Sequence, residues 1–436
     1  MSLDPGAPLQ TRRTFLRGAA VAAGTVALTP AWGRTPGAGE IAPLAELARR
    51  SQEAEDETFW ELVKRQFPLE PGLILMNAAN LCPSPFPVQE TVFRLTRDVD
   101  ADASFQNRDK FGDLHEASRS ALARYLGASP DEIAITRNTS ESNNTILNGL
   151  SLGPGDEVVL WDQNHPTNNI SWDVRAERWG FSVRRVSTPP APETEEELLG
   201  AFEAAIGDRT RVLAFSHVSN VTGVALPART LCHRARAAGI LTLVDGAQTF
   251  GALGVDLRDL GCDFYTGSAH KWFVGPKEAG VLYVRAERVG ELWASDVGVG
   301  WEGAVEGGAR KFENLGQRDD AAVAAIATTV AFHEAIGPDR IEARVRALAA
   351  ALEAAVRERV PGVALHTSDV PERSAGVVVV RLPLEDHAGL YRRLYDEHRI
   401  AGAPRGGEFP GVRFCPHIYN TMAEIERVAD VLAAEV

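Results

Sequence analysis

A lysine that follows a serine and a histidine is the first group in this chain that could do chemistry. The stretch GSAHKWFVGP places Ser268, His270 and Lys271 between an apolar strand pattern and a Gly-Pro turn. An amine in a polar cluster at a strand end can form a Schiff base with an aldehyde. Taken alone, Lys271 could equally be an ordinary surface lysine, so its neighbours decide the interpretation.

A carboxylate precedes this lysine at the end of another apolar strand pattern. In TLVDGAQ, Asp245 ends an apolar run, where an unpaired carboxylate would be costly. It therefore needs a cationic partner. A protonated pyridine nitrogen is one such partner, because the carboxylate keeps the ring charged and the charged ring withdraws electrons from a substrate Cα.

Short apolar strands alternate with helical segments from about residue 73 to about residue 285. We expect strands at EIAIT, EVVLW, RVLAFSHV, LTLVDGA, DFYTGSA and GVLYVR. Strands buried on both faces and separated by amphipathic helices predict a largely parallel α/β sheet. Active groups of such sheets gather at the carboxyl ends of the strands. The polar residues at these ends are Thr139, Ser140, His165, Asn220, Asp245 and Ser268 to Lys271.

A smaller C-terminal lobe is expected after a long Ala-rich helical region that runs from residue 317 to about 360. Its elements would be a strand at 376–382, a helix at 387–398, a strand at 411–417 and a last helix from about 423. The predicted organisation is a leader at 1–33, a linker and N-terminal helix at 34–72, a large domain at 73–330 and a small α+β domain at 331–436.

On these residues the chain resembles the class V aminotransferase and cysteine desulfurase superfamily, the fold-type I enzymes that depend on pyridoxal 5'-phosphate. The resemblance covers about residues 73 to 420 and centres on the DGAQ and SAHK motifs. It implies that Lys271 is the Schiff-base residue, that Asp245 pairs with the ring nitrogen and that Gln248 hydrogen-bonds the phenolic oxygen of the ring.

The resemblance also assigns residues around the ring and the phosphate of the cofactor. It implies that His165 stacks on the ring with Asn168 nearby, and that Asn220 lies on the ring or substrate side. The implied phosphate ligands are Thr139, Ser140, Ser268 and His270. Simpler readings stay open, because His165 could merely cap a loop, the Thr139-Ser140 pair could be a plain N-cap and Asn220 could tie down its loop.

Three further positions match segments that face the substrate or a second subunit. Arg413 matches the arginine that grips the substrate carboxylate, which a guanidinium fork can do bidentately, although it could also be a surface ion-pair residue. Asn77 matches a loop that closes over the substrate. Gly316-Gln317 stands where relatives often have Gly-Thr in the segment that a partner subunit contributes, and an amide can replace the hydroxyl donor. A homodimer with shared sites is implied.

The cysteines argue against persulfide chemistry. Desulfurases need a thiol on a mobile loop before the carboxylate arginine, and the corresponding stretch RIAGAPRGGEFPGVR contains no cysteine. Cys415 comes after Arg413 and is expected to be packed. The GQRD and NHP segments look closer to the isopenicillin N epimerase-like branch, which contains epimerases, lyases and transaminases.

The N-terminus resembles a twin-arginine export signal. Arg12 and Arg13 precede Phe15 and a mildly apolar Ala/Gly/Val run. The run is too short to span a bilayer, which takes ~20 apolar residues. A disordered basic tail is the alternative. A signal of this kind predicts export by the twin-arginine machinery, to the periplasm or otherwise out of the cytoplasm.

Composition excludes some function classes. The chain has 436 residues, 44% hydrophobic content and a net charge of -14, which suits a globular protein and argues against a nucleic-acid surface. The four cysteines form no CxxC pair and signal neither a zinc site nor a disulfide framework.

The sequence therefore predicts an exported pyridoxal-phosphate enzyme that acts on an amino group next to a carboxylate in a small molecule. We expect transamination during maturation of a siderophore, as in the similar periplasmic aminotransferase-like enzymes of pyoverdine maturation, or of another secondary metabolite. Alternatives are a lyase, an epimerase, or a non-catalytic binding or sensor protein. Intact Lys271 and Arg413 argue against the last, because a binding module needs no Schiff-base residue.

Overall fold

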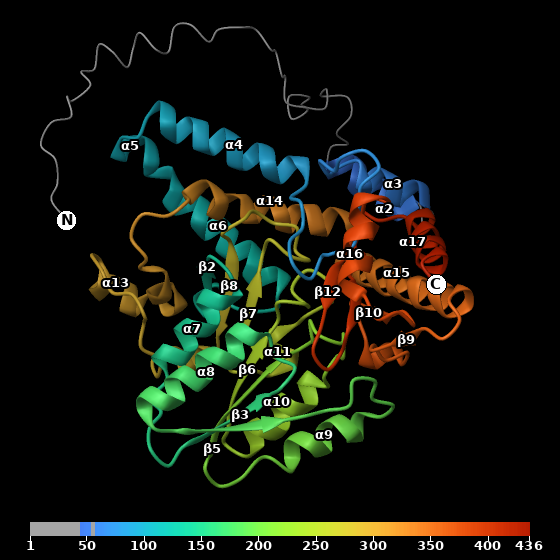
Figure 1. Cartoon of the computed structure of the whole chain (residues 1–436). Coiled ribbons are helices and arrows are strands. Elements are labelled where there is room, and N and C mark those ends of the chain that lie inside the picture. The colour runs from blue at the N-terminus through green and yellow to red at the C-terminus, as the bar shows by residue number, and fades with distance from the viewer. Residues whose placement is uncertain (1–43, 54–56) are drawn as a thin grey trace, which may run out of the picture. The chain divides into compact units, whose positions relative to one another are not determined.

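The computed structural model describes residues 44–53 and 57–436 (Figure 1). The predicted leader at 1–33 lies outside the described residues. Where the sequence predicted an N-terminal helix, the structure has two, α2 (Leu44–Glu53) and α3 (Glu57–Lys64).

A seven-stranded sheet forms the centre of the large domain. Its order is β2-β8-β7-β6-β5-β3-β4, and among these strands only β8 runs antiparallel to its neighbours. The strands are β2 (Ile133–Thr136), β3 (Glu157–Trp161), β4 (Ser182–Val186), β5 (Thr210–Ser216), β6 (Leu241–Asp245), β7 (Phe264–Ser268) and β8 (Gly280–Val284). The prediction of a largely parallel sheet is confirmed. Sequence reasoning missed the edge strand β4, because exposed Arg184 and Arg185 interrupt its apolar pattern.

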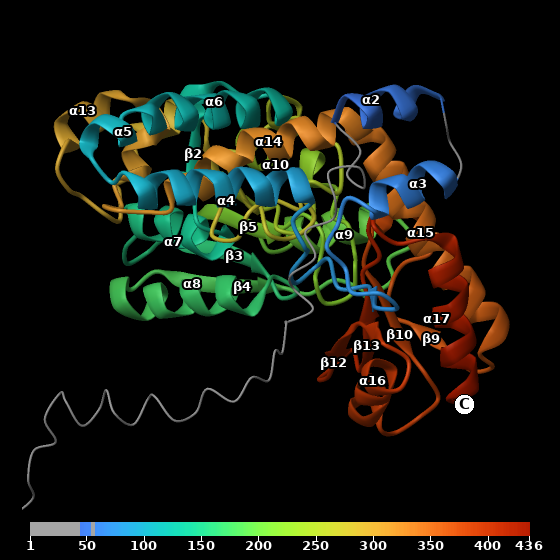
Figure 2. The ribbon, with the colours of Figure 1, turned by 90° about the horizontal axis from the view of Figure 1, so that it is seen from above.

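Helices cover both faces of this sheet (Figure 2). On one face, α7 (Thr139–Gly149) and α8 (Pro166–Trp179) pack Ile146, Leu147 and Trp172 against the strands. The other face is covered by α6 (Lys110–Tyr125), α9 (Glu195–Glu203), α10 (Ala228–Ala237) and α14 (Asp320–Ile336). The other helices of the large domain are α4 (Phe86–Ala101) and the short helices α5 (Phe105–Arg108), α11 (Leu257–Leu260), α12 (Ala286–Val289) and α13 (Trp301–Glu306). The strands are therefore buried on both faces, as their continuous apolar runs predicted.

The small lobe is an antiparallel sheet with helices packed against it. The sheet order is β12-β13-β10-β9, with β9 (Ala364–Leu365), β10 (Val378–Arg381), β12 (Ala403–Arg405) and β13 (Gly411–Phe414). Its helices are α15 (Pro338–Arg359), α16 (His387–Asp396) and α17 (Met422–Ala434). The predicted Ala-rich region is two helices, since the chain bends by 74° between α14 and α15. Gly337 occupies the bend with a φ of +101°, and the expected boundary at 330/331 falls inside α14.

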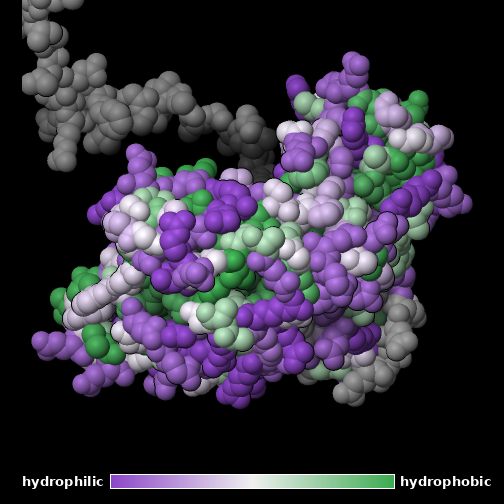
Figure 3. Space-filling model, turned by 90° about the horizontal axis from the view of Figure 1, so that it is seen from below, coloured by the Kyte–Doolittle hydropathy of each residue, from purple (hydrophilic) through white to green (hydrophobic). Residues whose placement is uncertain are grey.

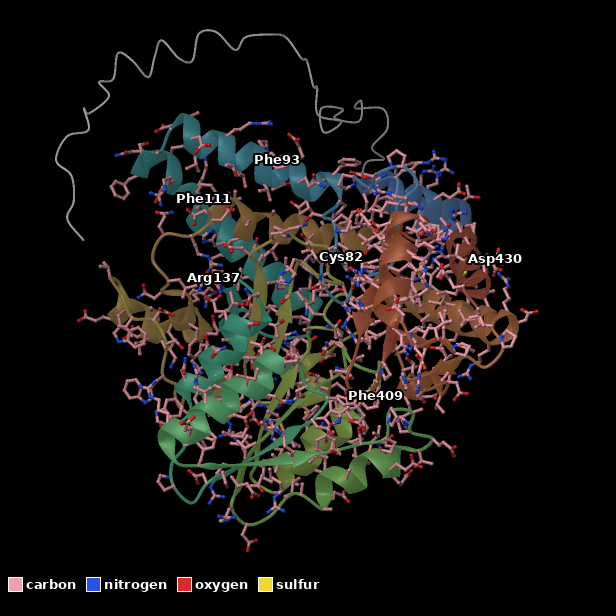
Figure 4. All side chains as sticks on the ribbon, in the orientation of Figure 1. Cys82, Phe93, Phe111, Arg137, Phe409 and Asp430 are labelled. Atoms are coloured by element: carbon pink, nitrogen blue, oxygen red, sulfur yellow. The ribbon has the colours of Figure 1, made fainter. Side chains whose placement is uncertain are left out.

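One N-terminal segment links the small lobe to the lysine loop. β1 (Ile74–Leu75) pairs in parallel with β11 (Ile400–Ala401), and Asn77 forms an isolated bridge with Cys415. The backbone N–H of Cys82, labelled in Figure 4, then donates to the carbonyl of His270 at 2.8 Å. The segment that was expected to close over a substrate is thus tied to both sides of the site.

Within the described residues, no single helix has the length and apolar content needed to cross a membrane. Hydrophilic residues cover much of the face shown in Figure 3, and apolar residues reach that surface in smaller groups.

Gly246, which directly follows Asp245, lets the ring of Tyr265 pack closely against the backbone. A Cβ at this position would lie 2.1 Å from Cζ of Tyr265, a fully buried side chain whose hydroxyl is 3.0 Å from that of Thr249. We expect Gly246→Ala to lower the free energy of unfolding by about 1–3 kcal/mol, because the core would be overpacked. Gly200→Ala, inside α9 with nothing within 4 Å, is the matched control and should be neutral or stabilising. Equal denaturation midpoints for the two variants would contradict this account.

Candidate active site

Strand direction brings the predicted residues together. Because β2, β3, β5, β6 and β7 all run the same way, the residues that follow them meet at one edge of the sheet. Lys271 interacts electrostatically with Asp245 and with Arg413 of the small lobe, and His165 interacts with all three. The site therefore lies where the edge of the large sheet meets the small lobe.

Asp245 is buried, and its carboxylate is held by neutral donors. One oxygen accepts from the backbone N–H of Ala247 at 3.0 Å, and the other from Nδ2 of Asn143 at 3.0 Å. Asn143 is itself oriented by Thr266, whose hydroxyl donates to its Oδ1 at 2.9 Å. Across the described ranges, no salt bridge joins Asp245 to a lysine or arginine. A buried carboxylate with two neutral donors and no cation fits a protonated ring nitrogen.

Sequence reasoning missed Asn143. An asparagine inside a helical TSESNN pattern gives no local signal, since its role depends on the strand end that α7 packs against.

Lys271 lies in surroundings that favour the neutral form of its amine. Burial lowers the pKa of its amino group, the positive charge of Arg413 lowers it further, and the carboxylate of Asp245 partly opposes both. The amine has no hydrogen-bond partner among the residues that the structure describes. A neutral, unengaged amine is the nucleophile that an aldehyde requires.

Two buried histidines fix the backbone that follows this lysine. Nε2 of His417 lies 2.7 Å from the carbonyl of Trp272, and Nε2 of His333 lies 2.9 Å from the carbonyl of Phe273. Burial lowers the pKa of His417 to about 3 and that of His333 to about 4, so both rings are neutral and each Nε2–H donates. His333 accepts in turn from the hydroxyl of Tyr125 at 3.1 Å. Neither histidine was predicted, since each is distant in sequence from the loop it holds.

The N-terminus of α7 and the end of β7 form a hydroxyl-lined cradle. The backbone N–H of Thr139 donates to Oγ of Ser268 at 2.9 Å, and the two hydroxyl oxygens lie 2.8 Å apart. The structure thus brings Thr139 and Ser268 together, with Ser140 exposed beside them. Half-buried His270 stands on the same loop, and burial, with smaller contributions from Lys271 and Lys277, lowers its pKa to about 4. Backbone N–H groups and hydroxyls at a helix N-terminus suit a phosphate.

His165 and Asn168 open α8 beside the site. Nδ1 of His165 accepts from the backbone N–H of Thr167 at 3.2 Å, so the ring caps the N-terminus of α8. Burial, with a further contribution from Lys271, lowers the pKa of His165, which keeps the ring neutral. Asn168 is 1% exposed, and neither amide atom of its side chain has a partner within the described residues. Such an orphaned amide is costly unless a ligand engages it.

The amide of Gln248 is locked in one orientation. Its Nε2 donates to the carbonyl of Ala79 at 3.2 Å, and its Oε1 accepts from the indole of Trp272 at 2.7 Å. One N–H of the amide remains for another acceptor, which fits the predicted contact with a phenolic oxygen.

Arg413 is buried and directed by two residues that were predicted with it. Nη1 donates to the carbonyl of Asn220 at 2.9 Å, and Nη2 donates to Oδ1 of Asn77 at 2.9 Å. Asn220 therefore acts here through its backbone. With 3% of its surface exposed, Arg413 is not a surface ion-pair residue.

Gln317 lies elsewhere on this chain. It is exposed, accepts from Nη2 of Arg108 at 2.8 Å, and lines a cavity of about 330 Å³ with Arg137 and Arg318. Figure 4 labels Arg137, which lies near α7. The role of Gln317 in a partner's site stays a prediction.

The four cysteines are free and buried. Cys415 is packed, as expected, and burial raises its pKa, while burial raises the pKa of Cys82 to about 12. Protonated, buried thiols are poor nucleophiles, so none of them suits persulfide transfer.

Comparison with known proteins adds a family and relatives. The family model described as Aminotransferase class-V matches residues 99–428. Isopenicillin N epimerase of Streptomyces clavuligerus is 34% identical over 395 residues, covering 86% of this chain and 98% of the relative. The isopenicillin N epimerase of Amycolatopsis lactamdurans is 34% identical over 398 residues, with the same two coverages of 86% and 98%. A solved structure of a C-DES mutant, with glycine covalently linked to its PLP cofactor, matches with a TM-score of 0.76 and 23% identity over 85% of this chain and 98% of that one.

The two buried histidines make stability depend on pH. Their folded pKa values of about 3 and 4 lie below the ordinary value of 6.5, so the unfolded chain binds protons that the folded chain excludes. Stability is therefore complete above pH 6.5 and is lost as the pH falls toward 4. We expect the free energy of unfolding to drop between pH 6.5 and 5 by about 2 kcal/mol for each histidine, measured by urea denaturation.

His333→Gln isolates one of these contributions, because the amide can still donate to the carbonyl of Phe273 but cannot be protonated. It should flatten the pH dependence, whereas His233→Gln at an exposed position should not. A slope that is unchanged in His333→Gln would contradict the assignment.

Proposed function

The chain belongs to the aminotransferase class-V family, and from this premise we propose that it is a pyridoxal-phosphate enzyme that acts on an amino group next to a carboxylate. One observation carries the choice of substrate class. Arg413 is buried beside the amine of Lys271, and no carboxylate of the described residues pairs with it. A buried guanidinium directed by two neutral acceptors retains N–H groups for a carboxylate from outside the chain.

The residues present fit the cofactor of this family. Thr139 and Ser268 would hold its phosphate, Asp245 its ring nitrogen, Gln248 its phenolic oxygen and Lys271 its aldehyde. His165 would lie against the ring. When bound, the cofactor supplies an electron-withdrawing ring conjugated with the amino group of the substrate.

The protein groups divide the remaining work. Arg413 binds the carboxylate, and Asn77 and the carbonyl of Asn220 fix the direction of its guanidinium. Lys271, with its lowered pKa, accepts the proton from Cα. Asp245 stays in place through Asn143 and Ala247, so its charge remains aimed at the ring. Neutral His333 and His417 keep the loop that carries Lys271 from shifting.

We propose transamination as the reaction, in the maturation of a siderophore or another secondary metabolite. Epimerisation is the second candidate, because two isopenicillin N epimerases are similar to this chain over 98% of their own lengths. Both reactions begin with removal of the Cα proton and differ in where a proton is returned. Persulfide transfer is disfavoured because the described cysteines are buried with protonated thiols.

Export and dimerisation complete the proposal. Support for periplasmic export comes from the paired arginines and apolar run at the N-terminus. Support for a homodimer comes from the family resemblance and from Gln317, which is exposed and available to a second copy.

The chemical form of the cofactor recovered after the reaction distinguishes transamination from epimerisation. The loaded enzyme should show a visible absorption band from the bond between Lys271 and the cofactor, and this band should shift or disappear in Lys271→Ala, with the variant still folded by circular dichroism. With amino acids in D₂O, transamination leaves the recovered cofactor as pyridoxamine phosphate, measured by mass. Epimerisation instead incorporates deuterium at Cα and inverts chirality while the cofactor returns unchanged.

Activity should fall at least about 1,000-fold in Lys271→Ala, since both the covalent attachment and the base are lost. A band that is identical in Lys271→Ala, or its absence from the wild-type protein, would contradict the enzyme proposal and favour a binding or sensor role.

Export is tested separately by fusing residues 1–40 to a fluorescent reporter that folds in the cytoplasm. We expect periplasmic fluorescence that Arg12→Lys/Arg13→Lys abolishes, because the twin-arginine route reads that pair. Fluorescence that stays cytoplasmic with the native pair would argue for a simple basic tail.

A further inference from the structure

A second arginine lies beside Arg413, in the loop where a desulfurase would need its thiol. In the small sheet, Ala403 is opposite Arg413 and Arg405 is opposite Gly411. Side chains alternate along a strand, so Arg405 projects from the same face as Ala403 and is the diagonal neighbour of Arg413. Both guanidinium groups donate to one atom, the carbonyl oxygen of Asn220, at 3.4 Å from Arg405 and 2.9 Å from Arg413.

No carboxylate of the described residues pairs with buried Arg413 or with half-buried Arg405. In the described part of the chain, the buried arginines other than Arg413 are each neutralised, Arg119 by Glu313 and Arg344 by Glu57. Arg413 and Arg405 make hydrogen bonds only to neutral oxygens among the described residues, and the buried Nε of each has no acceptor.

Other charges near the pair do not balance it. Lys271 and His165 interact electrostatically with Arg413, and neither side chain can supply a negative charge. The nearby carboxylate of Asp245 is already engaged by Asn143 and a backbone N–H. Burial, and next the charge of Arg413, lower the pKa of Arg405 to about 10, which reflects the cost of bringing the two cations together. Like charges in such a diagonal pair are destabilising unless an anion lies between or beside them.

The donors of the two side chains suit two anionic groups. Arg413 uses one N–H of each Nη to hold its position, and Arg405 spends its two Nη atoms on the carbonyls of Pro404 and Asn220. Each guanidinium keeps its Nε–H and further N–H groups on a planar fork. One fork can therefore take the α-carboxylate while the other takes a second anion on the same molecule.

We propose that Arg405 is a specificity residue that binds a second carboxylate of the substrate, so that the enzyme prefers amino acids or peptides with an acidic group besides the α-carboxylate. The inference rests on the proposed function for the assignment of Arg413 to the α-carboxylate. The glycine-rich turn after Arg405 leads to Phe409, which contacts the ring of His366 and lies beside the small lobe in Figure 4. This contact anchors the loop next to the subsite.

Binding of unreactive acids to the cofactor-loaded protein tests the subsite without turnover. Isothermal titration calorimetry would compare glutarate and succinate with butyrate. In the wild-type protein we expect at least one dicarboxylate to bind about 10-fold or more tightly than butyrate, the gain of one charged hydrogen-bonded pair. Arg405→Gln should remove this preference and leave butyrate affinity within about twofold.

Arg381→Gln is the matched control, because it removes the same charge from an exposed position of the same small sheet. It should keep the dicarboxylate preference. Arg405→Lys retains the positive charge but not the planar guanidinium, so it should keep only part of the preference for dicarboxylates. Thermal melting of each variant identifies any that are unfolded, and the lysine variant keeps the test decisive if the glutamine variant is unstable.

The inference fails if neither dicarboxylate binds more tightly than butyrate to the wild-type protein, or if Arg405→Gln keeps the preference. Equal weakening of all three acids would also overturn it, because Arg405 would then act only by positioning Arg413. Failure of the proposed function is a different result, since it would appear as the absence of a Lys271-dependent absorption band in the wild-type protein.

Discussion

Burial of unbalanced charge is the constraint on which this structure depends. Asp245 and Arg413 lie with Lys271 where the edge of a parallel sheet faces the small lobe, and no direct ion pair within the described residues neutralises either Asp245 or Arg413. Charges in such surroundings are costly. The fold can retain them because neutral groups hold each charged side chain in place and a bound ligand can supply the opposite charge. Asn143, Asn77 and the carbonyl of Asn220 are the neutral groups that do so.

The two lobes are coupled through the backbone around Lys271. His333 reaches this backbone from α14, and His417 reaches it from the chain beyond β13. The segment at 77–82 adds two hydrogen bonds. The backbone N–H of Cys82 donates to the carbonyl of His270, and the carbonyl of Ala79 accepts from the side chain of Gln248. A movement of the small lobe would therefore displace Lys271 and Arg413 together. Binding of a carboxylate by Arg413 would then be coupled to the position of Lys271, the proposed base.

Local pattern and tertiary contact explain what the sequence could predict. The central strands were predictable because they are continuous apolar runs, and their common direction places the polar residues that follow them at one edge. Asn143, His333 and His417 were missed because each acts on a loop far away in the chain. β4 was missed because two consecutive exposed arginines, Arg184 and Arg185, interrupt its apolar pattern. Whether Gln317 reaches the phosphate site of a partner depends on the position of a second subunit, which the sequence of one chain does not specify.

Arg405 bears on which substrate is bound and not on which reaction follows. A guanidinium on β12 does not touch the amine of Lys271, so it has no means of deciding whether a proton returns to Cα or elsewhere. It does lie beside the arginine that orients the carboxylate, and a second contact on the same molecule would restrict rotation about the first. A substrate held at two anionic groups presents one face of Cα to Lys271, and that restriction serves transamination and epimerisation alike. Under this proposal, the pair of arginines selects the substrate before the chemistry at Cα begins.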